Sequence, residues 1–175
     1  SDVIADSYPV RTIGSEQGKS NVVISGGKLS IPCGDWAITA SSNRSGDIIM
    51  TGGEVNVASD QAALYAANIK LSGGHLIAVG QARATLFAVD TSDYTGTGVV
   101  IGSVNADGSD PTSYVADNYK TYKWIEFPHQ HTFGDWDTVK KPTTKETGLK
   151  IRTCTECGYE EQQELPKRSN GGSGD

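Results

Sequence analysis

Apolar and polar residues alternate along the first two-thirds of the chain, and one alternating phrase occurs three times. Each copy reads apolar-x-apolar-[Ser/Thr]-Gly-Gly-x-apolar-x-apolar, and the copies span residues 22–31, 48–57 and 69–78. The first glycine of the pair stands at positions 26, 52 and 73, so the copies are 26 and 21 residues apart. Because successive side chains of a β-strand point to opposite faces, this pattern predicts strands with one buried face.

A further alternating run follows each copy, at residues 36–40, 62–66 and 84–88. Three short strands per repeat, none large enough to bury its own face, predict a solenoid whose equivalent strands pair along its axis. The Gly-Gly pair is expected at a corner that needs positive φ or a close backbone approach. We therefore predict an all-β chain with a short right-handed parallel β-helix of about four coils. An antiparallel sandwich is the alternative.

Partial copies are expected at both ends, a half copy at Val3 and residues 8–12 and a looser fourth copy at Val99 and Ile101. The aligned copies predict these columns of inward-facing residues: Val22/Ile48/Ile69, Ile24/Met50/Leu71, Leu29/Val55/Leu76, Ile31/Val57/Ala78, Val10/Ile38/Leu64/Leu86 and Thr12/Ala40/Ala66/Ala88. An outward column is expected at Arg11, Thr39, Tyr65 and Phe87, with Tyr65 beside Phe87. Exposed aromatic rings suit a sugar ring or another protein as ligand, and cover by a loop or by the C-terminal module is the alternative.

The repeat gives way to other patterns after residue 104. Residues 105–111 form a turn cluster, and we expect an Asx-type turn rather than a calcium site, because the distal glutamate of a calcium loop is missing. Residues 119–127 alternate and are β-prone, which predicts a strand that closes the open edge of the β-helix. The expected domains are residues 1–127 for the β-helix, 128–167 for a small β module and 168–175 for a flexible tail.

The small module carries Cys154 and Cys157 in a Cys-x-x-Cys-Gly pattern. This spacing is typical of one half of a zinc site, because the turn directs both sulfur atoms at one ion. Tetrahedral coordination needs two more ligands, and the histidines near the pair are His131 and His129. These four residues are the candidate Zn²⁺ site of a zinc-ribbon-like module. A vestigial site, a dithiol without metal and a disulfide are the alternatives that the sequence leaves open.

Composition fits the all-β interpretation and argues against some partners. Glycine makes up 21 of 175 residues, against a usual share of about 7%, and it favours turns over helices. The formal net charge of −6 argues against nucleic acid, because phosphate binding needs a basic face. No run of about 18 apolar residues occurs, so no membrane insertion is expected, and no signal-peptide pattern is present.

Two stretches resemble bacterial sequences. Residues 13–27, Ile-Gly-Ser-Glu-Gln-Gly-Lys-Ser-Asn-Val-Val-Ile-Ser-Gly-Gly, look like the Gly-rich β-helical repeats of large surface and adhesin-like proteins of Gram-positive bacteria. Related β-helical modules are carbohydrate-binding domains. The segment 131–166 is similar to a small repeat module that often follows such domains, on these residues: Phe133, Trp136, Gly148, Arg152, Cys154, Cys157, Gly158 and Glu160. That module commonly has a further cysteine where this chain has Thr144, so the resemblance implies a lost ligand with His129 as its substitute.

The resemblance implies an extracellular module, secreted or associated with the cell wall, that binds a polysaccharide or a host or cell-surface glycoprotein. The candidate contact residues are Tyr65, Phe87, Thr39 and Arg11. A structural stalk that displays other domains and has no ligand of its own is the alternative. Catalysis is not expected, because it needs clustered carboxylates, and the following acidic residues fall in different phases of the repeat: Asp35, Asp47, Glu54, Asp60 and Asp90.

Overall fold

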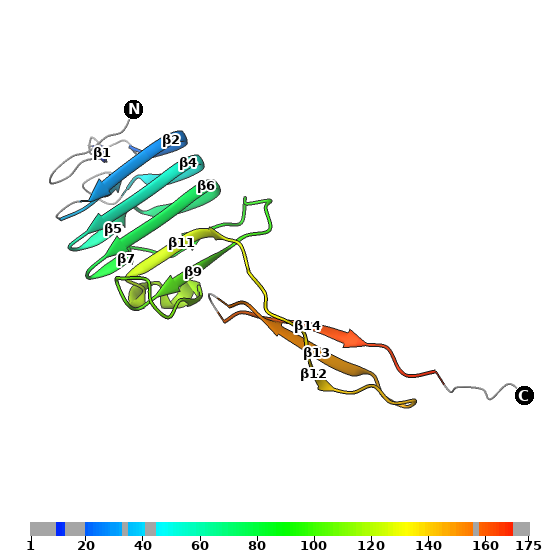
Figure 1. The fold of residues 1–175 in the computed structure, drawn as a ribbon. Helices are drawn as coiled ribbons and strands as arrows, with labels where there is room; N and C mark the ends of the chain where they lie inside the picture. The colour runs from blue at the N-terminus through cyan, green and yellow to red at the C-terminus, as the bar shows by residue number, and fades with distance from the viewer. Residues whose placement is uncertain (1–9, 13–19, 33–34, 41–44, 156–157, 170–175) are drawn as a thin grey trace, which may run out of the picture. The chain divides into compact units, whose positions relative to one another are not determined.

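The computed structural model describes residues 10–12, 20–32, 35–40, 45–155 and 158–169 (Figure 1). The chain divides into two compact units, residues 1–130 and 131–175, where the sequence places the boundary at residue 128. The described part of the chain is all-β, as predicted, with a short 3₁₀ helix, η1 (Ala116–Thr121), in the first unit. Cys33 and Cys157 lie outside the described residues.

Two sheets build the first unit. One contains four short parallel strands in the order β1-β3-β5-β7, namely β1 (Val10–Thr12), β3 (Ile38–Ala40), β5 (Ala62–Tyr65) and β7 (Arg83–Thr85). The other contains three long parallel strands, which lie side by side in Figure 1: β2 (Val22–Pro32), β4 (Asp47–Ser59) and β6 (Asn68–Gly80). Strands of successive repeats are therefore neighbours in both sheets.

The pairing of the long strands confirms four of the predicted columns. Val22, Ile48 and Ile69 stand next to one another across β2, β4 and β6, and Ile31, Val57 and Ala78 do so near the other end. The columns that begin at Ile24 and Leu29 have the predicted register as well. The members of these columns in β4 and β6 are all buried, so the alternation indicates the buried face correctly.

The Gly-Gly pairs lie within the long strands, at the positions where the register shifts. The second glycine has positive φ in each copy, +80° at Gly27, +91° at Gly53 and +86° at Gly74. A Cβ at Gly52 would lie 2.6 Å from the carbonyl oxygen of Ser25, and one at Gly73 would lie 2.4 Å from that of Thr51. The first glycine thus allows close approach to the preceding repeat, and the second provides the left-handed backbone.

The sheet of short strands departs from the predicted register at its last strand. Ile38 pairs with Leu64 as predicted, but Leu64 pairs with Thr85 instead of Leu86. The alternation of buried and exposed residues also fails in β3, because Thr39 is buried between Ile38 and Ala40. The predicted outward position of Thr39 and the predicted alignment of Phe87 with Tyr65 are both wrong. Consecutive residues are buried in β3 and in β5, where only Tyr65 is half-buried.

The end of the repeat is closed by an antiparallel strand, β11 (Trp124–His129), which pairs with residues 76–79 of β6. The predicted closing strand is therefore confirmed in its second half, whereas residues 116–121 form η1. The predicted fourth copy at Val99 and Ile101 is wrong, because β9 (Val99–Ser103) pairs with β11 and β10 (Thr112–Ser113) and not with a strand of the repeat. β8 (Val89–Asp90) continues the parallel pairing beside Ile69 instead.

The core of the first unit lies between its two sheets. Ile38 and Leu64 come from the short strands, Ile48 and Ile69 from the long ones, and Phe127 from the closing strand, and each is at most 2% exposed. Burial of one such side chain contributes about 1.5–3 kcal/mol to stability. A polar contact lines one end of the repeat, where the Asp47 N–H donates to Asn21 and the Asn68 amide donates to the Asp47 carboxylate, at 2.9 and 2.7 Å.

The second unit is a three-stranded antiparallel sheet in the order β12-β13-β14, with β12 (Asp137–Lys140), β13 (Gly148–Thr153) and β14 (Glu160–Leu165). All six residues of β13 pair with β14, from Gly148 opposite Leu165 to Thr153 opposite Glu160. The connection between these two strands carries the Cys-x-x-Cys-Gly sequence.

Candidate metal centre

Cys154 lies at the start of the turn that joins β13 to β14. Its N–H donates to the carbonyl of Tyr159 at 2.8 Å, and its carbonyl accepts from the N–H of Gly158 at 3.0 Å. Gly158 has φ +69°, a conformation that glycine adopts without strain. The turn holds the Cys154 side chain in a buried position, 2% exposed.

The segment before β12 runs beside this turn. The carbonyl of Thr132 accepts from the N–H and the hydroxyl of Thr155, at 2.9 and 3.1 Å, and Phe133 forms an isolated antiparallel bridge with Cys154. The ring of His131 stacks on Tyr159, with 4.6 Å between centroids and 9° between planes. His131 is therefore fixed on the side of the turn where Cys154 lies.

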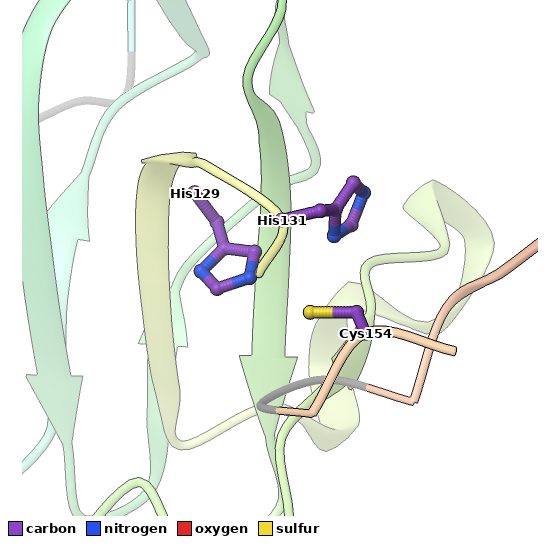
Figure 2. Close-up of side chains that lie close together, drawn as sticks. All are labelled: His129, His131 and Cys154. Carbon is purple, nitrogen blue, oxygen red and sulfur yellow. The ribbon is translucent and has the colours of Figure 1, made fainter. Parts of the chain in front are cut away.

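His129, His131 and Cys154 form a group that could hold a metal ion (Figure 2). One ligand atom from each lies within 4.8 Å of the others, and His129 and Cys154 are buried. His129 ends β11 and is separated from His131 by one residue. Zn–S and Zn–N bonds of about 2.3 and 2.1 Å place tetrahedral ligands about 3.3–3.8 Å apart, so side-chain movements have to bring these three ligand atoms closer together, and a tetrahedral site needs a fourth ligand.

The sequence predicted this group from its ligand types, and the structure brings three of the four predicted residues together. Cys157, the fourth, lies outside the described residues. Sequence reasoning missed Tyr159, which stacks on His131, and Glu126, whose carboxylate lies 3.8 Å from His129 Nδ1. The contact of Tyr159 forms only when the turn after β13 meets the segment before β12, and the contact of Glu126 depends on the irregularity in β11 between Glu126 and His129, which no sequence pattern indicates.

The second unit has almost no apolar core of its own. Within residues 131–155 and 158–169, Cys154 is the only apolar side chain that is buried. Its sheet carries cation–π contacts instead, with Lys150 over Trp136 at 4.4 Å and Arg152 over Phe133 at 4.3 Å. Such partly exposed contacts contribute about 0.5–1 kcal/mol each. Folded units of this size usually require disulfides, metals or oligomerisation.

The predicted ligand-contact residues do not form one surface column. Thr39 is buried, Tyr65 is half-buried with its ring 4.6 Å from Trp36, and Phe87 is 37% exposed with its ring 6.2 Å from Tyr119. The backbone of Arg11 pairs with Thr39, and its side chain is outside the description. Sequence reasoning missed Trp36 and Tyr119 as ring partners, because the pairing of the strands and the fold of η1 bring them to these positions.

Asp90, Asp107 and Tyr114 have pKa values shifted by their local surroundings. The N–H of Ser92 lowers the pKa of Asp90, and the hydroxyl and N–H of Ser109 lower the pKa of Asp107. The Asp107 contact is the predicted Asx-type turn. Burial raises the pKa of Tyr114, whose hydroxyl accepts from the N–H of Val89 at 3.1 Å. Each shift thus has an explanation within its own turn or contact.

Comparisons with family models, with curated proteins and with solved structures found no match to this chain. Among the described residues, no helix combines the length and the apolar character that crossing a membrane requires.

Proposed function

We propose that this chain is a non-catalytic structural module of a surface protein, in which bound Zn²⁺ holds the second unit together. The observation that carries this proposal is the group of His129, His131 and Cys154, whose ligand atoms lie within 4.8 Å of one another. The burial of Cys154 as the only apolar side chain in the described part of the second unit supports it independently. Zinc binding contributes directly to the folding free energy of such small units.

Zinc suits these residues better than a hard cation does. Thiolate and imidazole ligands favour Zn²⁺, whereas calcium and magnesium need oxygen ligands. We assign Cys157 as the fourth ligand, since a Cys-x-x-Cys turn directs two sulfur atoms to one ion. The turn with Gly158 at positive φ and the antiparallel pair β13–β14 support a zinc-ribbon-like interpretation of this unit.

Elemental analysis of the purified full chain tests the metal site. We expect about one zinc per chain, and we expect Cys154→Ser to retain much less of it, because loss of one of the four ligands of a tetrahedral site weakens zinc binding. Cys33→Ser is the matched control, which removes a thiol outside the Cys-x-x-Cys pair and should retain the metal. A chain that neither contains nor takes up zinc, or equal zinc content in wild type and Cys154→Ser, would contradict the proposal.

For the first unit we propose a short parallel β-helix that serves as a rigid stalk. The support is the in-register parallel pairing of equivalent residues from three repeats, such as Val22, Ile48 and Ile69. Stacked repeats of this kind transmit packing from one coil to the next and make an extended, stiff body. The extracellular location rests on the resemblance of residues 13–27 to repeats of bacterial surface proteins.

Glycan binding is the second candidate function, and the pair Phe87 and Tyr119 favours it. Their rings lie 6.2 Å apart and 30° from parallel, and Phe87 is 37% exposed. Aromatic rings at a surface can stack on a sugar ring. The partner would be a polysaccharide or a host or cell-surface glycoprotein.

Affinity electrophoresis in gels that contain soluble polysaccharides tests this candidate. If the rings bind sugar, Phe87→Ala and Tyr119→Ala will lose the retardation that the wild-type chain shows. Val99→Ala is the matched control, because Val99 is also 37% exposed. Glycan binding at this pair would be contradicted if all variants were retarded as strongly as the wild-type chain. It would also be contradicted if no polysaccharide retarded the wild-type chain.

A further inference from the structure

The carboxylate of Glu126 lies between two histidines of the first unit. One of its oxygens, Oε1, is 3.1 Å from Nε2 of His75, and the other, Oε2, is 3.8 Å from Nδ1 of His129. The His129 side chain is 4% exposed, the Glu126 side chain 24% and the His75 side chain 42%. The three side chains thus form a series that runs from the surface to the buried ring of His129.

A register shift in β11 explains how Glu126 reaches His129. Residues three apart on a regular strand point to opposite faces. The pairing of β11 with β9 shifts between Glu126 and His129. Irregularities of this kind re-aim side chains, and they recur near functional sites. The shift places the Glu126 carboxylate 3.8 Å from Nδ1 of His129. This separation is longer than a hydrogen bond, so a side-chain movement has to shorten it before Glu126 can orient the ring.

A histidine that binds a metal uses one ring nitrogen and usually donates the N–H of the other to a carboxylate or a carbonyl. This second contact fixes the tautomer and the orientation of the ring. Glu126 lies at Nδ1 of His129. A proton on Nδ1 would therefore leave Nε2 with the lone pair that a metal requires.

We propose that Glu126 is the positioning residue for the metal ligand His129, and that His75 holds the Glu126 carboxylate in place. In this arrangement Glu126 accepts the Nδ1–H of His129, and His129 presents Nε2 to the metal. The inference rests on the proposed zinc site, and it adds a residue that binds no metal itself. Glu126 acts through His129 alone.

Zinc affinity of the full chain, measured by competition with a chromophoric chelator, tests this inference. We expect Glu126→Ala to weaken zinc binding by about 10- to 100-fold, as loss of such an outer contact typically does. Glu126→Gln retains an oxygen acceptor without the charge and should fall between wild type and Glu126→Ala. Glu54→Ala is the matched control, because Glu54 is an exposed glutamate of the same sheet that pairs with Lys28, and it should bind zinc as wild type does.

A double-variant cycle shows whether Glu126 acts through His129. In a His129→Ala background, Glu126→Ala should have no further effect on zinc affinity. The d–d absorption bands of bound Co²⁺ should change in Glu126→Ala, because the field of the His129 ligand changes. If Glu126→Ala lowers the melting temperature of the first unit, Glu126→Gln replaces it in these tests. Glu126→Gln keeps the shape of the side chain and therefore shows whether zinc binding depends on the carboxylate.

The outcomes separate this inference from the zinc proposal. A wild-type chain that binds no zinc would overturn both. Normal zinc binding by wild type with unchanged affinity and Co²⁺ spectrum in the Glu126 variants would overturn only the role of Glu126. An equal loss of affinity with and without His129 would also overturn it, since the effect would then not pass through that ligand.

Discussion

Single glycines determine how closely the repeats stack. Gly53 and Gly74 combine positive φ with backbone contacts to the preceding repeat, and an added Cβ would lie 2.9 Å or less from its atoms in both cases. Gly27 has the same conformation, but no heavy atom lies within 4 Å of the position of its Cβ. Substitutions at these three equivalent glycines can therefore distinguish the stability lost through the positive φ from the stability lost through the contact with the preceding repeat.

Alanine at Gly27 and at Gly74 should destabilise the first unit to different degrees. Gly27→Ala introduces only the left-handed conformation, which costs about 1–2 kcal/mol for a residue with a Cβ. Gly74→Ala adds a clash with the backbone of Gly52 and Gly53, and we expect a total loss of about 2–5 kcal/mol. Urea denaturation followed by far-UV circular dichroism measures both. Equal losses would show that the contact between repeats is looser than described.

The hydroxyl of Tyr114 should make stability fall at alkaline pH. Burial raises its pKa above the ordinary value of 10.0, so the folded state favours the neutral phenol. Its contribution is complete below pH 10 and is lost as the pH rises through the higher folded pKa. Tyr114→Phe should therefore show a smaller loss of stability than wild type between pH 9 and about pH 11, measured by urea denaturation. Parallel pH profiles would contradict this interpretation.

The metal-binding group could be predicted from the sequence, because the residue types themselves indicate metal ligands. Histidine and cysteine near a Cys-x-x-Cys turn indicated the metal group, and three of the four predicted ligands lie together. The position of Glu126 beside His129 could not be predicted, because it depends on a register shift in a strand whose partners are distant in sequence. The same applies to the burial of Thr39, which the alternating pattern placed outside.

The long strands and the short strands differ in how much the sequence reveals. In β4 and β6 a repeated phrase with a central Gly-Gly pair specifies the register, and the observed pairing matches it. In β7 and the residue that follows it, Ala84, Thr85 and Leu86 are all buried, so alternation gives no information about the offset. The predicted pairing was therefore wrong by one residue. Where every position of a strand is buried, the burial pattern does not distinguish one register from the next.

The closing strand β11 should contribute strongly to the stability of the first unit. Phe127 is completely buried, pairs with Leu76 across the strands and contacts the ring of Tyr94 at 4.9 Å. Phe127→Ala should cost about 3–5 kcal/mol, because it leaves a cavity in the core. Phe87→Ala removes the same side chain at a site that is 37% exposed, and it should cost about 1 kcal/mol or less. Thermal melting compares them, and similar losses would argue that β11 does not close the core.

At the scale of the whole molecule, the two units differ in what stabilises them. The first has a continuous apolar core that draws on both of its sheets. The described part of the second buries Cys154 and otherwise relies on strand pairing, ring contacts and the pair Arg152–Glu161. An exposed or half-exposed ion pair contributes at most about 1 kcal/mol. The sequence predicts a metal as a further source of stability for the second unit.

Hydrogen exchange of the full chain, measured by mass spectrometry with and without a zinc chelator, tests this account most directly. We expect chelation to remove the protection of β13 and β14 and to leave that of β4 and β6 unchanged, because the proposed zinc stabilises the second unit, whereas the first has its own apolar core. Restoring zinc should restore the protection. Protection of β13 and β14 that is the same with and without chelator would contradict the claim that zinc holds this unit together.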